Sequence, residues 1–159
     1  VEMCFDNLRD FKGNVLILSG DVPLISSKTL EKLIESKESA GAKASILTAE
    51  IDDPKGYGRI IRNSKGLLSQ IKEHKDCKEK ELLINEINAG IYVIENECLF
   101  EYIPKIDNKN VQGEYYLPDL INLLLSDDFP VKVHKTEHII EISGINSQKQ
   151  LNELEEYKA

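Results

Sequence analysis

The apolar residues of the first fifty positions follow two kinds of pattern. Residues 14–18 and 44–49 are nearly continuous apolar runs, which are typical of strands buried on both faces of a sheet. Between them, apolar side chains recur at helical spacing after Ser26 or Ser27, either of which can cap a helix, while Lys37 falls on the face expected to contact water. A strand, a helix and a second strand form the unit of a parallel sheet with a right-handed crossover, so the pattern predicts an α/β fold.

The middle of the chain predicts a loop, a hairpin and a further strand or pair of strands. Residues 52–58 combine aspartate, proline and glycine, so we expect a loop with unusual backbone angles. The short runs 59–62 and 67–72 flank a four-residue turn signal that ends in Gly66, which predicts a hairpin. The apolar segment 84–94 then predicts the next strand or strands.

The last third predicts helices alternating with short strands. Residues 95–103 have a helical pattern that stops before a proline, and residues 117–125 place their apolar side chains on one helical face. Short strands are expected at 131–133 and at 139–142. A final helix capped by Ser147 completes the pattern. Without internal repeats or a clear linker, residues 1–159 are expected to form a single domain.

Composition and charge narrow the class of protein. Against 28 Asp and Glu there are 20 Lys and Arg, and the net charge of −8 argues against an extended nucleic-acid surface. No apolar run approaches the roughly 20 residues of a membrane helix, and the first ten residues have no signal-peptide pattern, so no membrane contact is expected. Three cysteines without metal-site spacing fit reduced thiols. The default expectation is a cytoplasmic protein.

Two candidate ligand-binding carboxylates follow predicted strands. Asp21 comes where the first strand ends, and open α/β sheets bind ligands beyond the carboxyl ends of their strands, which favours a metal or phosphate site. A turn or a helix cap is the alternative for Asp21, and spacing does not separate the two. Glu73 begins a charged run after the hairpin, where its carboxylate can accept hydrogen bonds from sugar hydroxyls. A solvated charge cluster is the commoner fate of such runs.

Two further candidates depend on the backbone around them. Gly56 and Gly58 allow the chain to approach a ligand closely, although an ordinary tight turn into the hairpin is the favoured alternative. Asn88 places an amide inside an apolar strand. A buried amide needs partners at both ends, so the neighbouring backbone or a ligand must supply them.

Tyr116 and Asn146 complete the set of candidates. Tyr116 can lie against a sugar or a base, although paired tyrosines more often form half-buried packing. Asn146 is either a helix cap or a neutral oxygen ligand for a hard cation. The sequence contains no P-loop, dinucleotide-binding or Cys-x-x-Cys motif, and His134 and His138 are not expected to share a face. A cysteine and histidine nucleophile pair stays open, because no local signature marks or excludes one.

Six short motifs stand in an order that resembles one known family. Together they closely resemble the uridyltransferase domain of the bacterial bifunctional enzymes that combine N-acetylglucosamine-1-phosphate uridyltransferase with glucosamine-1-phosphate acetyltransferase. Each motif is weak by itself, but six in the same order are specific. They occupy residues 20–24 (GDVPL), 53–59 (DPKGYGR), 73–76 (EHKD), 86–91 (EINAGI), 112–116 (QGEYY) and 144–146 (GIN).

The resemblance implies a Rossmann-like nucleotidyltransferase fold, with a mixed, mostly parallel sheet, helices on both faces and the amino-terminal part missing. It implies synthesis of UDP-N-acetylglucosamine and pyrophosphate from UTP and N-acetylglucosamine 1-phosphate, for cell-wall precursors. Because the substrate's own phosphate is the nucleophile, no catalytic triad is needed. The site residues that the resemblance implies are Asp21 and Asn146 as catalytic ligands of Mg²⁺, Gly58, Glu73 and Asn88 around the N-acetylglucosamine part, Tyr116 near it, Ser19 beside the uridine, and Gly20 as a further substrate-binding residue.

The resemblance also implies differences from complete relatives. Relatives begin with a glycine-rich loop whose basic residues wrap the triphosphate, and since this chain contains no such loop, it is expected to be inactive alone. Many relatives carry threonine where this chain has Pro118. Full-length relatives are homotrimers through an acetyltransferase domain that is absent here. The alternatives are a non-catalytic module that binds UDP-sugars, and a nucleotidyltransferase for another sugar 1-phosphate.

Overall fold

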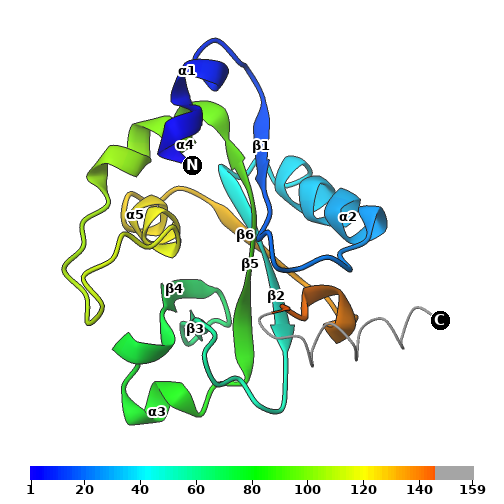
Figure 1. Ribbon diagram of the computed structural model, residues 1–159, viewed down its shortest axis with the longest axis vertical. Coiled ribbons are helices and arrows are strands. Elements are labelled where there is room, and N and C mark those ends of the chain that lie inside the picture. The colour runs from blue at the N-terminus through cyan, green and yellow to red at the C-terminus, as the bar shows by residue number, and fades with distance from the viewer. Residues whose placement is uncertain (146–159) are drawn as a thin grey trace.

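The computed structural model describes residues 1–145, which form a six-stranded sheet with helices on both faces (Figure 1). The strands are β1 (Asn14–Ile17), β2 (Ala44–Glu50), β3 (Arg59–Arg62), β4 (Leu68–Lys72), β5 (Glu86–Glu95) and β6 (Val131–Lys135). The α-helices are α1 (Phe5–Leu8), α2 (Ser27–Glu38), α3 (Glu79–Leu82), α4 (Asn96–Tyr102) and α5 (Pro118–Ser126). Short 3₁₀ helices occur at η1 (Glu2–Cys4), η2 (His74–Asp76), η3 (Ile103–Lys105) and η4 (Ile139–Ile142).

The long strand β5 is the centre of the sheet. The strand order is β4-β3-β5-β2-β6, and β1 adds to β5 on the edge that β3 also uses. β1 and β2 run in the same direction, as the predicted unit requires, but β5 lies antiparallel between them. In the described part of the chain, β2 and β6 are the one adjacent parallel pair, although β1, β2, β3 and β6 share a direction. The expected mixed α/β sheet is therefore confirmed, but the prediction that it is mostly parallel is wrong. Four of the five strand pairings among the described residues are antiparallel, because β5 runs opposite to each of the strands it pairs with.

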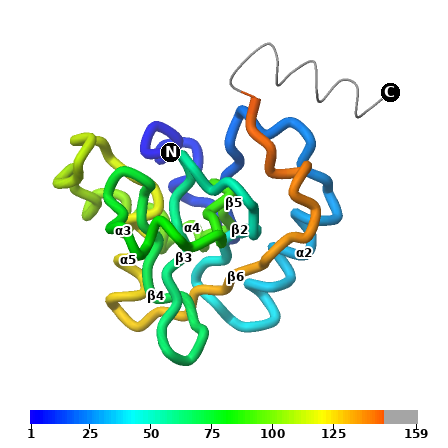
Figure 2. Tube along the Cα trace, turned by 90° about the horizontal axis from the view of Figure 1, so that it is seen from below, coloured from blue at the N-terminus to red at the C-terminus, as the bar shows by residue number. Residues whose placement is uncertain are grey.

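Two hydrophobic cores lie on opposite faces of this sheet. Figure 2 shows α2 on one side of the strands and α5 on the other. On the α2 side, the fully buried Leu33 packs with Leu47 and Val93 of the sheet. On the other side, Leu99 of α4 and Ile121 of α5 form the second core. Alternate residues of β2 and β5 enter the two cores, which explains why their sequences are nearly continuous in apolar residues.

Helix α2 begins where the sequence predicts it, but one side chain of its last turn is buried instead of exposed. The Ser26 hydroxyl accepts a hydrogen bond from the Thr29 backbone N–H at 3.2 Å, as an N-cap does. The prediction that Lys37 contacts water is wrong, because its side chain is only 5% exposed. A lysine buries its long apolar stem readily. Burial lowers the pKa of the Lys37 ammonium group, although the charge of Glu95 acts in the opposite direction.

Two strand predictions need correction. Residues 139–142 form the 3₁₀ helix η4 rather than a strand, because Glu141 N–H bonds to His138 O at 3.0 Å and a single side chain, Ile142, is deeply buried. One apolar anchor does not make the alternating face that a strand needs. Residues 14–17 do form β1, but each is half-buried, because β1 pairs with β5 alone in the described part of the chain. The helix expected from Ser147 lies outside the described residues.

Two further features concern the helices and the cysteine thiols. None of the helices between residues 1 and 145 has the length and apolar character of a membrane span. Cys4, Cys77 and Cys98 are all free thiols, and Cys98, a residue of α4, is buried in the core that α4 and α5 form with the sheet.

Candidate functional site

A cavity of about 470 Å³ opens where the ends of β1 and β4, the loop before β3 and the middle of β5 meet. Five of the eight candidate residues line it, although they come from four separate segments of the chain. These are Ser19, Asp21, Gly58, Glu73 and Asn88. Of the other three, Gly20 is not among the lining residues, Tyr116 lines a neighbouring cavity, and Asn146 lies outside the described residues.

A bulge in β5 shapes one wall of the cavity. The pairing of β2 with β5 slips between Ile46 and Thr48, where β5 contributes three residues against one. Gly90 lies in this bulge with a φ of +73°, and a Cβ there would come within 2.7 Å of Ser19 Oγ. Glycine is therefore required on both counts. The Ser19 hydroxyl donates to the Gly90 carbonyl at 3.1 Å, which ties the end of β1 to the bulge.

Asn88 is the first residue before the bulge and is 7% exposed. Its Nδ2 donates to the Tyr92 hydroxyl at 2.6 Å, and its Oδ1 accepts from the Gly90 N–H at 3.2 Å. A side-chain amide has two N–H donors and two acceptor positions. The neighbouring chain thus uses one N–H donor and one acceptor position of the Asn88 amide. The second donor and the second acceptor position remain for a ligand.

Gly58 lies between Asn88 and Glu73. Its carbonyl accepts the Asn88 backbone N–H at 2.9 Å, which joins the loop to β5. A Cβ on Gly58 would lie 3.1 Å from Glu73 Oε1, closer than most side-chain contacts allow. Glycine at this position therefore lets the Glu73 carboxylate approach the loop. A close approach of the same loop to a ligand stays a prediction.

Arg59 supports the same loop without entering the cavity. Its side chain is 2% exposed, and its guanidinium donates to the Tyr57 carbonyl and faces His74 Nδ1 at 3.5 Å. Tyr57 belongs to the loop and His74 directly follows Glu73. A buried arginine at this position connects two segments that line the cavity.

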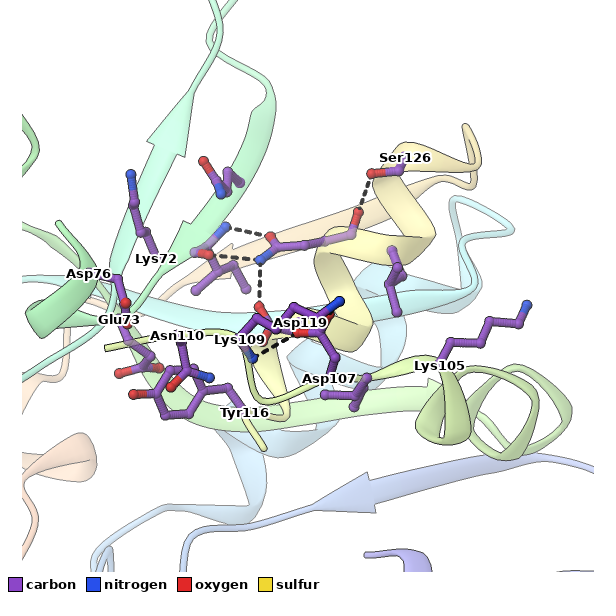
Figure 3. A pocket seen from close by; sticks show the side chains of 15 residues that line it. Lys72, Glu73, Asp76, Lys105, Asp107, Lys109, Asn110, Tyr116, Asp119 and Ser126 are labelled. Carbon is purple, nitrogen blue, oxygen red and sulfur yellow. Dashed lines mark hydrogen bonds and ion pairs between the residues drawn. The ribbon is translucent and has the colours of Figure 1, made fainter. Parts of the chain in front are cut away.

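Glu73 lies at the junction of two cavities. The second, of about 380 Å³, is lined by Glu73, Tyr116, Asp119 and Asp76 among others, and Figure 3 shows Glu73 and Tyr116 on the same side of it. Burial, and then the nearby carboxylates Asp119 and Asp76, raise the pKa of Glu73. Tyr116 is half-buried, and its hydroxyl accepts from Gln112 Nε2. A carboxylate shielded from water in this way is a strong acceptor for hydroxyl donors.

Asp21 presents an exposed carboxylate to the first cavity, and its side chain forms no ion pair or hydrogen bond with residues 1–145. Its backbone oxygen accepts from the Ile145 N–H at 2.8 Å, so the residue that precedes Asn146 in the sequence is held against Asp21. No three His, Cys, Asp or Glu side chains of the described residues gather as a metal-binding group. One carboxylate in an open cavity fits Mg²⁺, which commonly takes most of its ligands from phosphate oxygens and water.

Several lining residues were not identified from the sequence. Tyr92 follows Asn88 by four positions on one strand, so the period of two was a signal that placed both on one face. Ile142 gave no local signal, and Gly144 was marked only as part of the 144–146 motif, with no role assigned to it. They reach the cavity because the segment after β6 returns beside the chain that follows β1 (Figure 2).

A mixed α/β sheet with a cavity at its strand ends is the arrangement of an α/β protein that binds a ligand beside the sheet. The sequence matches the nucleotidyl transferase family over residues 2–153, so the chain belongs to this family. The resemblance inferred from the six motifs is confirmed.

Similar proteins refine the relationship. The chain is 46% identical over 155 residues to the bifunctional protein GlmU of Bacillus mycoides (strain KBAB4), covering 98% of the chain and 34% of that protein. It is 47% identical over 148 residues to GlmU of Bacillus thuringiensis (strain Al Hakam), covering 93% and 32%. The chain therefore spans about a third of the length of these curated relatives.

A solved structure supports the fold. The chain superposes with a TM-score of 0.62 on a Bacillus anthracis protein described as a glucose-1-phosphate thymidylyltransferase in complex with sucrose. The two sequences are 20% identical, and the match covers 95% of this chain and 62% of that one. At this level of identity the similarity establishes the nucleotidyltransferase architecture and nothing more specific.

Proposed function

We propose that this chain forms the sugar-phosphate half of a uridyltransferase site, at which UTP and N-acetylglucosamine 1-phosphate give UDP-N-acetylglucosamine and pyrophosphate. The observation that carries the proposal is the cavity that gathers Ser19, Asp21, Gly58, Glu73 and Asn88. The identity of 46% to GlmU supports it. The free thiols support a reducing, cytoplasmic location. A homotrimer formed through a separate acetyltransferase domain stays a prediction.

The sugar would be held by hydrogen bonds from three neighbouring segments. Glu73 offers a shielded carboxylate to sugar hydroxyls, and Asn88 offers one N–H and one acceptor position. Gly58 brings the loop backbone close to both. Such a set orients a sugar 1-phosphate so that its phosphate points toward Asp21, which lines the same cavity. Tyr116, from the neighbouring cavity, would contact the sugar at the Glu73 side.

The reaction needs positioning and charge neutralisation rather than a protein nucleophile. An oxygen of the sugar phosphate attacks the α-phosphorus of UTP, a new P–O bond forms, and the bond to the β-phosphate breaks to release pyrophosphate. Asp21 and Asn146 would hold Mg²⁺, which when bound neutralises phosphate charge. Ser19 and Gly20, on the segment after β1, would border the uridine. Ser19 is fixed for this purpose by its hydrogen bond to Gly90.

A second candidate function is a non-catalytic module that binds UDP-sugars. Among the described residues that line the cavity, Lys55 is the one basic side chain, whereas Asp21 and Glu73 are acidic. Two multiply charged phosphates would meet little positive charge from residues 1–145. Removing a single donor aimed at transition-state charge costs about 10² to 10³ in rate, so we expect slow pyrophosphate release from the chain alone.

Isothermal titration calorimetry tests the proposal directly. The 159-residue chain is titrated with UDP-N-acetylglucosamine, UDP-glucose and UTP, each with and without Mg²⁺, and pyrophosphate release is followed in parallel. Tighter binding of UDP-N-acetylglucosamine than of UDP-glucose, strengthened by Mg²⁺, is expected. Sugar-selective binding with no turnover under any condition favours the binding module. Preference for UDP-glucose identifies another sugar 1-phosphate as the substrate, and no binding of any of the three contradicts the site.

A further inference from the structure

Tyr92 is a core residue whose hydroxyl reaches the candidate site. Its ring packs with Ile46 and Ile94 in the core beneath α4 and α5, and the whole residue is 3% exposed. The same side chain lines the first cavity, and its hydroxyl lies 2.6 Å from Asn88 Nδ2. Because the bulge of β5 lies between the two residues, their side chains come together although they are four positions apart.

The hydrogen bonds around Asn88 leave one orientation for its amide. The Gly90 backbone N–H can only donate, so the atom that faces it at 3.2 Å must be the oxygen Oδ1. The nitrogen Nδ2 then faces Tyr92, and the tyrosine oxygen accepts one of its two N–H bonds. With a phenylalanine at 92 the nitrogen side would have no partner, and the amide would be held at one end only.

The tyrosine is suited to this role because it stays neutral. Burial raises the pKa of the Tyr92 hydroxyl by more than the hydrogen bond from Asn88 lowers it, and the nearby Glu73 carboxylate raises it further. The hydroxyl therefore keeps its proton throughout the pH range in which proteins are stable. Its oxygen therefore accepts from Asn88 at every such pH. Among residues 1–145, no group accepts a hydrogen bond from the Tyr92 O–H.

We propose that Tyr92 is a positioning residue that sets the orientation of the Asn88 amide, so that one fixed N–H and one fixed acceptor face the sugar. The inference rests on the proposed function, since it assigns Asn88 to sugar binding. It goes further in naming the residue that orients this contact. Tyr92 acts through Asn88, so its effect must vanish when the Asn88 side chain is removed.

The binding test compares Tyr92→Phe with a matched control. Tyr102 lies in the same core at 2% exposure, and its hydroxyl donates to Asp127 away from the cavity. Tyr92→Phe should weaken UDP-N-acetylglucosamine binding by about five- to tenfold, the effect of one well-formed hydrogen bond, whereas Tyr102→Phe should leave it within about twofold. In an Asn88→Ala background, Tyr92→Phe should cost nothing further. Losses that multiply in the double variant would overturn the proposal.

A second measurement needs no ligand and separates this proposal from the proposed function. In ¹⁵N-labelled protein, the side-chain amide resonances of Asn88, assigned by their loss in Asn88→Ala, should shift strongly in Tyr92→Phe and stay in place in Tyr102→Phe. Failure of the parent chain to bind the sugar nucleotide contradicts the proposed function, and the amide shift then still decides whether Tyr92 holds Asn88. Unchanged Asn88 amide resonances in Tyr92→Phe overturn the positioning role, whatever the parent binds.

Discussion

Glu86 and Asn88 lie two residues apart on β5, and each is 7% exposed, yet their surroundings differ completely. Glu86 accepts from Arg62 Nε at 2.7 Å, from a second Arg62 nitrogen at 2.6 Å, and from the Thr48 hydroxyl at 3.0 Å. Asn88 lies beside a cavity and has half of its hydrogen-bonding capacity unused by the local chain. Burial does not distinguish the two residues, whereas unused hydrogen-bonding capacity facing a cavity does.

Glu86 and Glu73 show the same contrast between paired and unpaired groups, because their pKa values shift in opposite directions. Burial alone would raise the pKa of Glu86, but the hydrogen bonds from Arg62 and Thr48 outweigh it, and the net pKa is lowered. Glu73 has no basic partner among the causes of its shift, and burial with neighbouring carboxylates raises its pKa. Glu86, which stabilises the fold, is thus paired with a cation. Glu73, which we assign to ligand binding, lies where its charged form is disfavoured.

The largest expected effect comes from breaking the Glu86 cluster. Arg62→Met leaves a buried carboxylate without its partner and should lower the free energy of unfolding by about 2–3 kcal/mol, less than for a fully buried pair because Arg62 is partly exposed. Urea unfolding measures the loss. Adding Glu86→Leu should recover more than half of it, and affinity for UDP-N-acetylglucosamine should stay within about twofold. A large loss of affinity in the folded variant would contradict the separation of the two regions.

Asn88→Ala should show the opposite profile. Removing the amide is expected to weaken UDP-N-acetylglucosamine binding by about ten- to a hundredfold, while the free energy of unfolding changes by less than about 1 kcal/mol. The control is Asn85→Ala, because Asn85 is exposed three residues earlier and does not line the cavity. Calorimetry measures the affinity of both variants for UDP-N-acetylglucosamine, and urea unfolding measures their free energies of unfolding. Equal affinities for Asn88→Ala and Asn85→Ala would make Asn88 a structural residue like Glu86.

A smaller effect is expected from adding one methyl group at Gly58. In Gly58→Ala the new Cβ would meet Glu73 Oε1 at 3.1 Å, so the carboxylate must move by a few tenths of an ångström. We expect binding of the sugar nucleotide to weaken about three- to tenfold, with little change in unfolding. Gly66→Ala is the control for binding, since a Cβ there meets no atom within 4 Å and Gly66, in the hairpin turn, does not line the cavity. If both alanine variants bind alike, the close approach of Glu73 to the loop has no part in binding.

The smallest effect is a change in stability with pH, and it has opposite signs at the two glutamates. The folded pKa of Glu73 is raised above 4.5, so its contribution to stability is present below that pH and is lost as pH rises through the folded value. The folded pKa of Glu86 is lowered, so its contribution is present above 4.5 and is lost as pH falls through the folded value.

Glu73→Gln should therefore raise the melting temperature by about 1–2 °C at neutral pH and leave it unchanged near pH 4, because partial exposure screens the repulsion. Glu86→Gln should lower the melting temperature at neutral pH and have less effect in acid. Differential scanning calorimetry at both pH values provides the comparison. A fall in melting temperature at neutral pH for Glu73→Gln would show that Glu73 is a stabilising residue.

Much of the site could be predicted because its residues sit in short motifs with strong local meaning. The amide inside an apolar strand marked Asn88, and the paired glycines marked the loop that contains Gly58. The bulge at Gly90 could not be predicted, because a register shift depends on how two distant strands pair. The convergence of Asp21 with Glu73 likewise depends on tertiary structure.

The fold was predictable wherever apolar periodicity was long enough to bury a face. Helix α2 and strand β5 follow their patterns closely. Residues 139–142 were mistaken for a strand, because four residues rich in isoleucine have strand propensity but no neighbouring strand to pair with, and packing of Ile142 decided the outcome. Lys37 shows the converse, since a charged residue on a polar helical face became buried where the helix meets the sheet.

Pro118 has a consequence for how substrate preference can evolve. Parts of the cavity wall are pairs of residues in close contact, such as Gly58 with Glu73 and Gly90 with Ser19, so adding a side chain at either glycine displaces its neighbour. Pro118 lines the cavity from the first position of α5, where the helix requires no backbone N–H donor, so replacing the proline removes no hydrogen bond from the helix. Changes at this single helix start can alter the ligand contact surface while the bulge and loop stay intact. Libraries that seek new sugar preferences should therefore begin at position 118.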